Sequence, residues 1–168
     1  LRALQGGVTT DQIFGLVRDL RRDVTIPLAF MTYANVVFSY GAERFFSACR
    51  ETGIDGLILP DLPFEEKEEV DVVAGNYGID LISMIAPTSK ERISKIAKGA
   101  KGFLYVVSSM GVTGERTNIT TDIGGMLKEI RSVSNVPAAV GFGIHTPDQA
   151  AEMGRRVKKI FSIRKNGV

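Results

Sequence analysis

Two glycine-containing turns have residue types and spacing that suit a specific chemistry. Gly111 and Gly114 follow the apolar run 103–107, and the turn 141–143 follows the apolar run 136–140. Glycine-rich turns that lead into helix N-termini hold phosphate, because backbone N–H groups point at the anion and the helix dipole favours negative charge. The turns therefore predict a phosphate site, and for an isolated Gly-Phe-Gly the alternative is a turn that binds nothing.

Few carboxylates are placed for acid–base chemistry. Asp61 directly follows an apolar run, so it suits either the cap of a helix or contact with a ligand. Glu115 lies in the loop that contains Gly111, where closure of a mobile lid would bring it inward. The acidic run 65–71 falls in the first turns of a predicted helix, and this position is typical of a solvated face.

The remaining polar and aromatic candidates divide into pocket and core residues. Tyr33 and Tyr105 lie at or near the ends of predicted strands, where an aromatic ring lines a pocket while its hydroxyl finds a polar partner. His145 is the only histidine and has no partner for a metal or a nucleophile, so a surface or capping role is expected. Cys49 shares an apolar helix face with two phenylalanines and is expected in the core. The motifs predict no metal site.

Composition limits the class of protein. The chain has 168 residues, 44% apolar content, 24% charged residues and a formal charge of +2, which favour one globular domain and no nucleic-acid or membrane surface. A single cysteine excludes an internal disulfide and indicates a reducing compartment. No apolar run approaches the ~18 residues of a membrane span and no signal peptide is apparent, so a cytoplasmic protein is expected.

One unit recurs along the chain, consisting of a short apolar run, a turn of small residues, an amphipathic helix and a glycine. The apolar runs predict parallel strands covered on both sides, at Ile26 to Met31, Gly56 to Leu59, Leu81 to Ile85, Phe103 to Val107 and Val136 to Val140. Capping boxes predict helix starts at Thr9, Thr88 and Thr146, and glycines predict left-handed helix ends at Gly53, Gly78 and Gly99. Apolar helix faces are predicted at Ile13, Leu16, Val17 and Leu20 and at Ile123, Met126, Leu127 and Ile130.

Strands that alternate with helices at this spacing predict right-handed βαβ units and an α/β fold with a parallel sheet. Unusual residues follow several different strands, and in an eight-stranded (β/α)8 TIM barrel these loops converge on one mouth. The barrel is therefore favoured over a doubly wound sheet, which concentrates its glycines after the first strand. Five clear strands and one weak one predict a partial barrel over residues 1–168, a single domain with an atypical tail at 156–168.

Several segments together resemble the tryptophan synthase alpha subunit family. They occur in the order and spacing of the family and are PLAFMTYANVVFSYG, GIDGLILPDLPFEE, APTS, YVVSSMGVTGER and VPAAVGFGIHTPDQAAEMG. The resemblance extends from residue 1 to about residue 155. MTYANVVF, GVTG and GFGI are specific in combination, whereas each alone is weak.

The resemblance implies a lyase of tryptophan biosynthesis, EC 4.2.1.20, with a barrel fold. Such an enzyme cleaves indole-3-glycerol phosphate by a retro-aldol step to indole and glyceraldehyde 3-phosphate, without a metal or an organic cofactor in this subunit. The indole then passes to a beta subunit that carries pyridoxal phosphate in an alpha2beta2 complex. This resemblance implies no nucleic-acid or membrane partner.

The resemblance also implies roles for individual residues. The residues implied to line the indole pocket are Met31, Tyr33, Pro60, Ile85 and Tyr105. The residues implied in the closing loop and the phosphate site are Thr113, Gly114, Phe142 and Gly143, of which the two glycines donate backbone N–H groups. Asp61 is implied at the mouth, near the contact with the beta subunit.

Two catalytic carboxylates of the family, a glutamate and an aspartate, are expected upstream of residue 1, so the resemblance implies no catalytic residue within this sequence. The tail 156–168 also departs from the last phosphate-binding turn of the family. Since loss of one general acid or base costs about 10²- to 10⁴-fold, we expect a fragment without appreciable lyase activity by itself. The alternatives are a non-catalytic module that binds phosphate or pairs with the beta subunit, and another phosphate-binding barrel of aromatic amino-acid biosynthesis, which TYAN together with GVTG disfavours.

An unclosed barrel leaves strand edges unpaired and apolar surface exposed. We therefore expect the isolated chain to be poorly soluble or to form oligomers.

Overall fold

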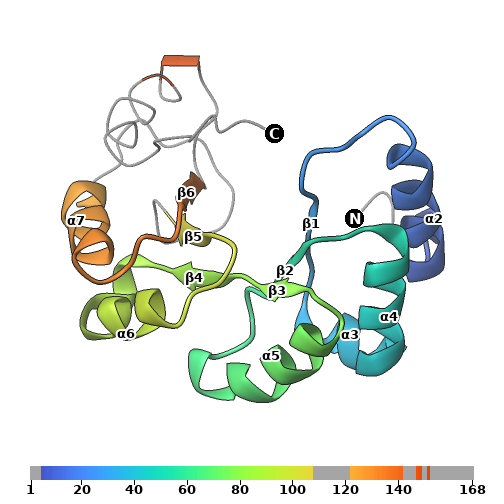
Figure 1. Ribbon diagram of the computed structural model, residues 1–168, viewed down its shortest axis with the longest axis horizontal. Helices are drawn as coiled ribbons and strands as arrows, with labels where there is room; N and C mark the ends of the chain where they lie inside the picture. The colour runs from blue at the N-terminus through green and yellow to red at the C-terminus, as the bar shows by residue number, and fades with distance from the viewer. Residues whose placement is uncertain (1–4, 108–121, 142–146, 149–150, 152–168) are drawn as a thin grey trace. The chain divides into compact units, whose positions relative to one another are not determined.

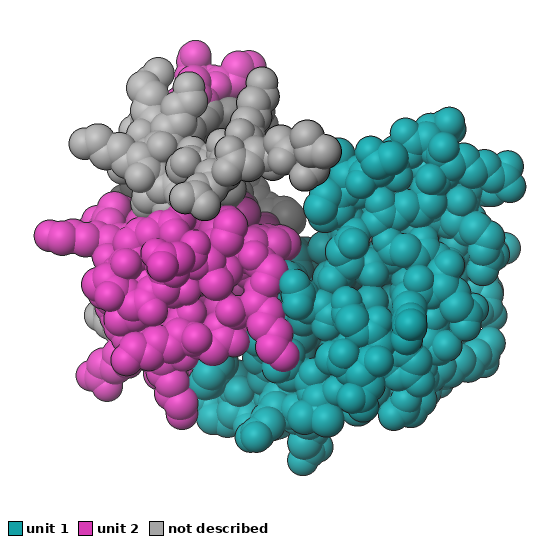
Figure 2. Space-filling view, viewed as in Figure 1, with its two compact units in different colours: residues 1–82 teal, residues 83–168 magenta. Residues whose placement is uncertain are grey.

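A computed structural model describes residues 5–107, 122–141, 147, 148 and 151. Short parallel strands alternate with helices along the chain, as predicted (Figure 1). The chain separates into two compact units, Leu1–Ile82 and Ser83–Val168 (Figure 2). Each unit has a three-stranded sheet of its own. The single domain over 1–168 stays a prediction, and the tail 156–168 lies outside the described residues.

The first unit is built on a parallel sheet of order β1-β2-β3. Its elements in chain order are α2 (Thr10–Leu20), β1 (Ala29–Met31), α3 (Ala34–Tyr40), α4 (Ala42–Thr52), β2 (Gly56–Ile58), the 3-10 helix η1 (Phe64–Glu66), α5 (Lys67–Asn76) and β3 (Asp80–Leu81). Because the strands are parallel, the loops that follow β1 and β2 leave from the same edge of this sheet.

The helix ends of the first unit follow the predicted capping chemistry. Thr9 Oγ1 accepts from the N–H of Gln12 at 3.3 Å, and Gln12 Oε1 accepts from the N–H of Thr9 at 2.9 Å. Gly53 ends α4 in the left-handed conformation, with φ 80° and ψ 31°. Gly78 follows α5 with φ 73°. The capping box at Thr9 and the glycine ends at Gly53 and Gly78 are therefore confirmed.

An aromatic cluster forms the core of the first unit. Its rings are those of Phe14, Phe30, Tyr40, Phe45 and Phe46. Phe14 and Phe45 meet edge to face with ring centroids 5.4 Å apart, a favoured geometry for aromatic pairs. Cys49 is fully buried in the same core, which confirms its predicted place.

The face that α2 turns to the core differs from the predicted one. Phe14 and Val17 are buried, whereas Ile13, Leu16 and Leu20 are exposed, Leu16 to 60%. The predicted apolar face is thus wrong apart from Val17, because the aromatic cluster accepts the ring of Phe14 and rotates the helix toward it. The exposed stripe provides apolar surface for the predicted self-association, which stays a prediction.

The first strand is also less covered than predicted. All three residues of β2 are buried, as expected for a strand covered on both sides. In β1, however, Ala29 and Met31 are exposed and Phe30 is half-buried. Among the described residues β1 pairs with β2 alone, so its second edge has no strand beside it. The strand is also shorter than the predicted Ile26 to Met31, and its three residues pair one to one with the three residues of β2.

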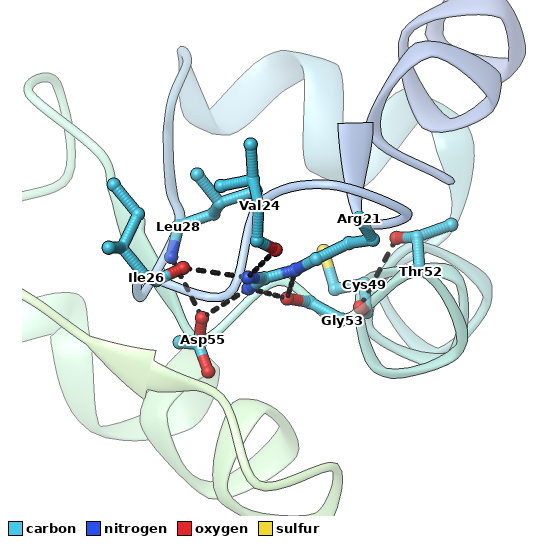
Figure 3. Close-up of polar contacts among 8 residues, drawn as sticks. All are labelled: Arg21, Val24, Ile26, Leu28, Cys49, Thr52, Gly53 and Asp55. Atoms are coloured by element: carbon cyan, nitrogen blue, oxygen red, sulfur yellow. Dashed lines mark hydrogen bonds and ion pairs between the residues drawn. The ribbon is translucent and has the colours of Figure 1, made fainter. Parts of the chain in front are cut away.

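Arg21, at the end of α2, is the centre of a polar cluster on the side of the sheet where the strands begin (Figure 3). Its guanidinium donates to three backbone carbonyls, those of Val24, Ile26 and Gly53, at 3.3, 2.6 and 2.8 Å. It also pairs with Asp55 at 2.6 Å, and the same carboxylate oxygen accepts from the N–H of Leu28 at 2.8 Å. One side chain thus ties α2 to the segment that enters β1 and to the loop before β2.

The second unit has a parallel sheet of order β4-β5-β6. Its elements are β4 (Ser83–Ile85), the 3-10 helix η2 (Pro87–Arg92), α6 (Ile93–Lys98), β5 (Leu104–Val107), α7 (Ile123–Val133) and β6 (Ala138–Gly141). Helix α7 buries the predicted apolar face of Ile123, Met126, Leu127 and Ile130. No helix in the described ranges has the length and apolar character needed to cross a membrane.

One predicted strand is divided between the two units. The segment 81–85 becomes β3, which pairs with β2, and β4, which pairs with β5. The N–H of Ile82 still donates to the carbonyl of Leu57 at 2.8 Å, so the change of partner falls directly after it. The one polar residue of the run, Ser83, is the first residue of β4, but a single serine within an apolar run does not predict a change of partner strand.

Two helix signals in the second unit are wrong. The capping box predicted at Thr88 lies inside η2, where Ser89 Oγ accepts from the N–H of Ala86 at 3.1 Å. The chain therefore makes a 3-10 turn before α6. Gly99 ends α6 with φ −92°, outside the left-handed region, and the positive φ of 59° falls at Gly102 instead.

Candidate functional site

Predicted site residues of the first unit lie where its parallel strands end. Met31 is the last residue of β1, and Tyr33 precedes α3 with a side chain 63% exposed. Pro60 follows β2 by two residues and is exposed, as is Asp61. Met31 is in register with Ile58, so these residues share one edge of the sheet. The structure thus brings together the predicted site residues of the first unit, which are Met31, Tyr33, Pro60 and Asp61.

Asp61 connects the two loops at that edge. Its carboxylate oxygens accept from the N–H of Ala34 at 2.9 and 3.2 Å. Ala34 is the first residue of α3, whose N-cap residue, Tyr33, makes no side-chain capping bond. The sequence left capping and ligand contact open for Asp61. The structure places the carboxylate as a cap on α3, the helix before it in the chain.

The second unit places Tyr105 against the backbone of Gly141. Tyr105 is half-buried on β5, and Gly141 ends β6. A β carbon added to Gly141 would lie 2.6 Å from Cζ and 3.0 Å from Cε2 of the tyrosine ring. Such distances are too short for a side chain, so glycine is required for the ring to lie here. An aromatic ring therefore rests on the strand that leads into the predicted phosphate turn.

Ile85 is placed differently from Tyr105. It is fully buried at the end of β4 and pairs with Val106, whereas Tyr105 pairs with Met84. Since successive side chains of a strand point to opposite faces, Ile85 and Tyr105 lie on opposite faces of the sheet. The structure brings Met84 rather than Ile85 to the face of Tyr105, and the role of Ile85 in a pocket stays a prediction.

Several predicted residues lie outside the described ranges. These are Gly111, Thr113, Gly114, Glu115, Phe142, Gly143, His145 and the capping box at Thr146. Their roles stay predictions.

The described side chains also form a groove that sequence reasoning missed. Phe38, on α3, is 56% exposed and lines a groove with Leu62 and residues of η1 and α5. Helical spacing indicates that the side chain of Phe38 is exposed. Phe38 directly follows the buried Val37, and adjacent residues of a short helix point to different sides. In the described ranges, no group of three or more His, Cys, Asp or Glu side chains is placed to hold a metal ion.

The arrangement suits binding more directly than acid–base chemistry. Exposed aromatic and apolar side chains lie at the carboxyl ends of parallel strands, where ligands bind in such folds. Among the described residues between β1 and α3, between β2 and η1, and between β4 and η2, Asp61 is the one carboxylate. Its oxygens are engaged by Ala34.

Comparison with known proteins assigns the family. A model of the family described as tryptophan synthase alpha chain matches residues 1–160. The chain belongs to this family. It is 48% identical over 153 residues to the tryptophan synthase alpha chain of Lacticaseibacillus casei and 48% identical over 151 residues to that of Geobacillus kaustophilus. These matches take in 91% and 89% of the chain but only 58% and 56% of the relatives.

Solved structures of the family share the fold of the chain. The tryptophan synthase alpha subunit from Campylobacter jejuni superposes with a TM-score of 0.79 at 38% identity, over 91% of this chain and 61% of that one. A tryptophan synthase structure from Mycobacterium tuberculosis gives 0.81 at 31% identity, over 92% of this chain and 59% of that one. The predicted fold class, a partial (β/α)8 barrel with parallel strands alternating with helices, is confirmed.

Proposed function

We propose that the chain is the substrate-binding portion of a tryptophan synthase alpha-type lyase. The substrate would be indole-3-glycerol phosphate, cleaved by a retro-aldol step to indole and glyceraldehyde 3-phosphate in tryptophan biosynthesis. The alpha subunit would need no cofactor of its own, and its partner would be a beta subunit that carries pyridoxal phosphate. Family membership supports the reaction class, and the chain spans only 58% of the Lacticaseibacillus casei relative.

One observation supports this substrate above all, which is the position of Tyr105 on Gly141. The substrate joins a flat aromatic ring to a phosphate. An aromatic side chain offers a surface for the ring, and the turn predicted from the sequence at 141–143 would offer backbone N–H groups for the phosphate. In the proposed assignment Tyr105 contacts indole, and Gly143, with Gly114, donates to the phosphate beside Phe142.

The family resemblance proposes further indole contacts, which are considered within the first unit alone. Met31, Tyr33 and Pro60 present apolar surface where β1 and β2 end. Ile85 and Thr113 complete the proposed set, Ile85 as a buried support and Thr113 in the closing loop. Desolvation of the indole ring by such side chains contributes binding free energy in proportion to the apolar area buried.

Cleavage needs more than these contacts provide. Breaking the bond between indole and the glycerol chain requires a proton on the ring carbon, charge stabilisation at the ring nitrogen, and removal of a hydroxyl proton. Two positioned carboxylates suit these tasks, and Asp61 is already engaged with Ala34. We therefore propose that these 168 residues bind substrate and do not turn it over appreciably.

An assay of indole release from indole-3-glycerol phosphate tests the lack of turnover. The purified 168-residue chain is compared with the intact alpha chain of Lacticaseibacillus casei under the same conditions. We expect a rate at least about 10²-fold lower for the 168-residue chain, the lower limit for loss of one general acid or base. A comparable rate would overturn this part of the proposal.

The alternative function is a non-catalytic module that binds phosphate or pairs with the beta subunit. The hydrogen bond between Asp61 and Ala34 favours this alternative, because it gives the carboxylate of Asp61 a structural role rather than a catalytic one. Binding of indole-3-glycerol phosphate to the parent chain and to Tyr105→Val, measured with the beta subunit present, separates the two functions. Loss of a substrate contact such as Tyr105 should weaken this binding in a lyase portion and should leave it unchanged in a pairing module.

A further inference from the structure

One row of side chains crosses the sheet of the second unit. Met84 on β4 is in register with Tyr105 on β5, and Tyr105 is in register with Ala139 on β6. Residues paired between parallel strands point to the same face of a sheet, and neighbouring strands lie about 4.8 Å apart. All three side chains are half-buried. Met84, Tyr105 and Ala139 therefore form a partly accessible row, the 84–105–139 row, on one face of this sheet.

The opposite face of the same sheet is closely packed. Ser83 on that face is 4% exposed, and Ile85, Leu104 and Val106 are fully buried. The two faces thus differ in their access to solvent. A ligand that binds to the sheet of this unit would reach the 84–105–139 row rather than the packed face.

The ring of Tyr105 extends from β5 over the end of β6. A β carbon added to Gly141 would lie 2.6 Å from Cζ and 3.0 Å from Cε2 of this ring. Gly141 is two residues beyond Ala139 and therefore shares its face of β6. Because neither residue has a side chain larger than a methyl group, β6 leaves room for the ring. On the other side of Tyr105, the neighbour in the row is Met84.

The chemistry of methionine suits contact with an aromatic ligand. Its side chain is unbranched and flexible, and its polarisable thioether makes favourable contacts with aromatic rings. An aromatic ligand that stacks on the β4 side of Tyr105 would lie over β4 and meet the side chain of Met84. The volume of this side chain would then limit the width of the ring that fits beside Tyr105.

We infer that Met84 is a specificity-determining residue, which contacts the aromatic part of the ligand and limits the size of the ring accepted beside Tyr105. The identity of this ring as indole rests on the proposed function, whereas the limit that Met84 sets rests on the geometry of the 84–105–139 row. A shorter side chain at this position should therefore admit a substituted ring that the parent chain rejects.

Dissociation constants of the full 168-residue chain test this inference. The ligands are indole-3-glycerol phosphate, indole, and the isomers of indole that carry one methyl group on the benzene ring. Met84→Ala and Met84→Val both shorten the side chain, and valine is also well suited to a strand. Both variants should bind indole several-fold more weakly, because an apolar contact is lost. At least one methylindole should gain about tenfold relative to indole, since one methylene in an apolar pocket changes affinity by about this factor.

Two further variants provide the controls. Met84→Leu keeps the size of the side chain and should leave the preference among the indoles within about twofold of that of the parent. Val106→Ala removes apolar volume from the packed face of the same sheet, so it should lower stability without changing this preference. Circular dichroism shows whether each variant is folded. A change in Val106→Ala as large as that in the two shortened Met84 variants would overturn the inference, because it would indicate a general loosening of the sheet.

The choice of ligands separates this inference from the proposed function. Binding of indole-3-glycerol phosphate with an unchanged preference in Met84→Ala and Met84→Val would overturn the inference and leave the proposed substrate standing. A changed preference among the indoles, with indole-3-glycerol phosphate bound no more tightly than indole, would support the inference and contradict the proposed substrate. A folded parent chain that binds none of these ligands would overturn both.

Discussion

The carboxylate of Asp61 caps the N-terminus of α3 by accepting from the N–H of Ala34 at 2.9 and 3.2 Å. The cap comes from the loop after β2, 27 residues further along the chain. A helix of seven residues has little stability of its own, and its first N–H groups need acceptors. The contact therefore orders the two loops at the edge of the sheet where the predicted substrate residues of the first unit lie.

Removal of this cap should destabilise the first unit. We expect Asp61→Ala to lower the free energy of unfolding by about 1 kcal/mol, and Asp61→Asn by a few tenths, because asparagine caps almost as well as aspartate. Urea unfolding followed by circular dichroism measures both. Asp23→Asn, at an exposed position on a turn, serves as the control. Equal losses for all three variants would contradict the capping role.

Arg21 should be irreplaceable by lysine. Its guanidinium reaches three backbone carbonyls and Asp55 at once, and a lysine ammonium has no planar fork with which to do so. We expect Arg21→Lys to lower the free energy of unfolding by about 1 kcal/mol, because the partly buried carbonyls of Val24 and Gly53 lose their charged donor. Arg22→Lys is the matched control, because Arg22 makes only an exposed ion pair with Asp19 at 3.2 Å. A similar effect of the two changes would refute the account of Arg21.

Gly141 and Tyr105 should be energetically coupled. Gly141→Ala forces a β carbon into the tyrosine ring and should cost about 1–3 kcal/mol of stability. In a Tyr105→Val background the same change should cost clearly less, because the ring is gone. A double-mutant cycle in urea gives the coupling. Additive effects, with no coupling beyond about 0.5 kcal/mol, would mean that the ring does not rest on Gly141.

Burial raises the pKa of the Cys49 thiol from its ordinary 9.0 to about 12. In the unfolded chain the thiol loses its proton near its ordinary pKa, while the folded chain keeps it. The contribution of Cys49 to stability is therefore complete below about pH 9 and is lost as the pH rises toward 12. Unfolding free energies of the parent and of Cys49→Ala across this range measure the difference.

Thiol alkylation provides a second test of the burial of Cys49. The folded chain should react with iodoacetamide far more slowly than the same chain in denaturing urea, because the thiolate is the nucleophile and the sulfur is fully buried. Fast alkylation without denaturant, or the same pH dependence in Cys49→Ala, would show that this thiol is not held in the core.

Sequence reasoning located the repeated strand and helix units because each depends on local chemistry. The capping box at Thr9 and the left-handed end at Gly53 involve residues within one turn of each other. The buried face of α7 follows from helical spacing in the same way. Such features depend little on the rest of the fold, so a single sequence is enough to predict them.

Contacts between distant segments were beyond prediction from the sequence. The spacing of Ile13, Leu16 and Leu20 fits a helix face, yet the aromatic cluster turns Phe14 to the core. Whether Asp61 caps its own helix or α3 depends on how two loops meet. In the run 81–85 only the serine at 83 coincides with the change of partner strand, and a single serine does not predict it. In each case tertiary packing decides between local alternatives of similar energy.

A calorimetric titration of indole-3-glycerol phosphate into the 168-residue chain tests the central claim most directly. The account predicts saturable binding that Tyr105→Val weakens and Arg22→Lys leaves unchanged, because the proposed function assigns an indole contact to Tyr105 and none to the exposed Arg22. No measurable binding by the folded chain, or binding equally tight in Tyr105→Val, would contradict it.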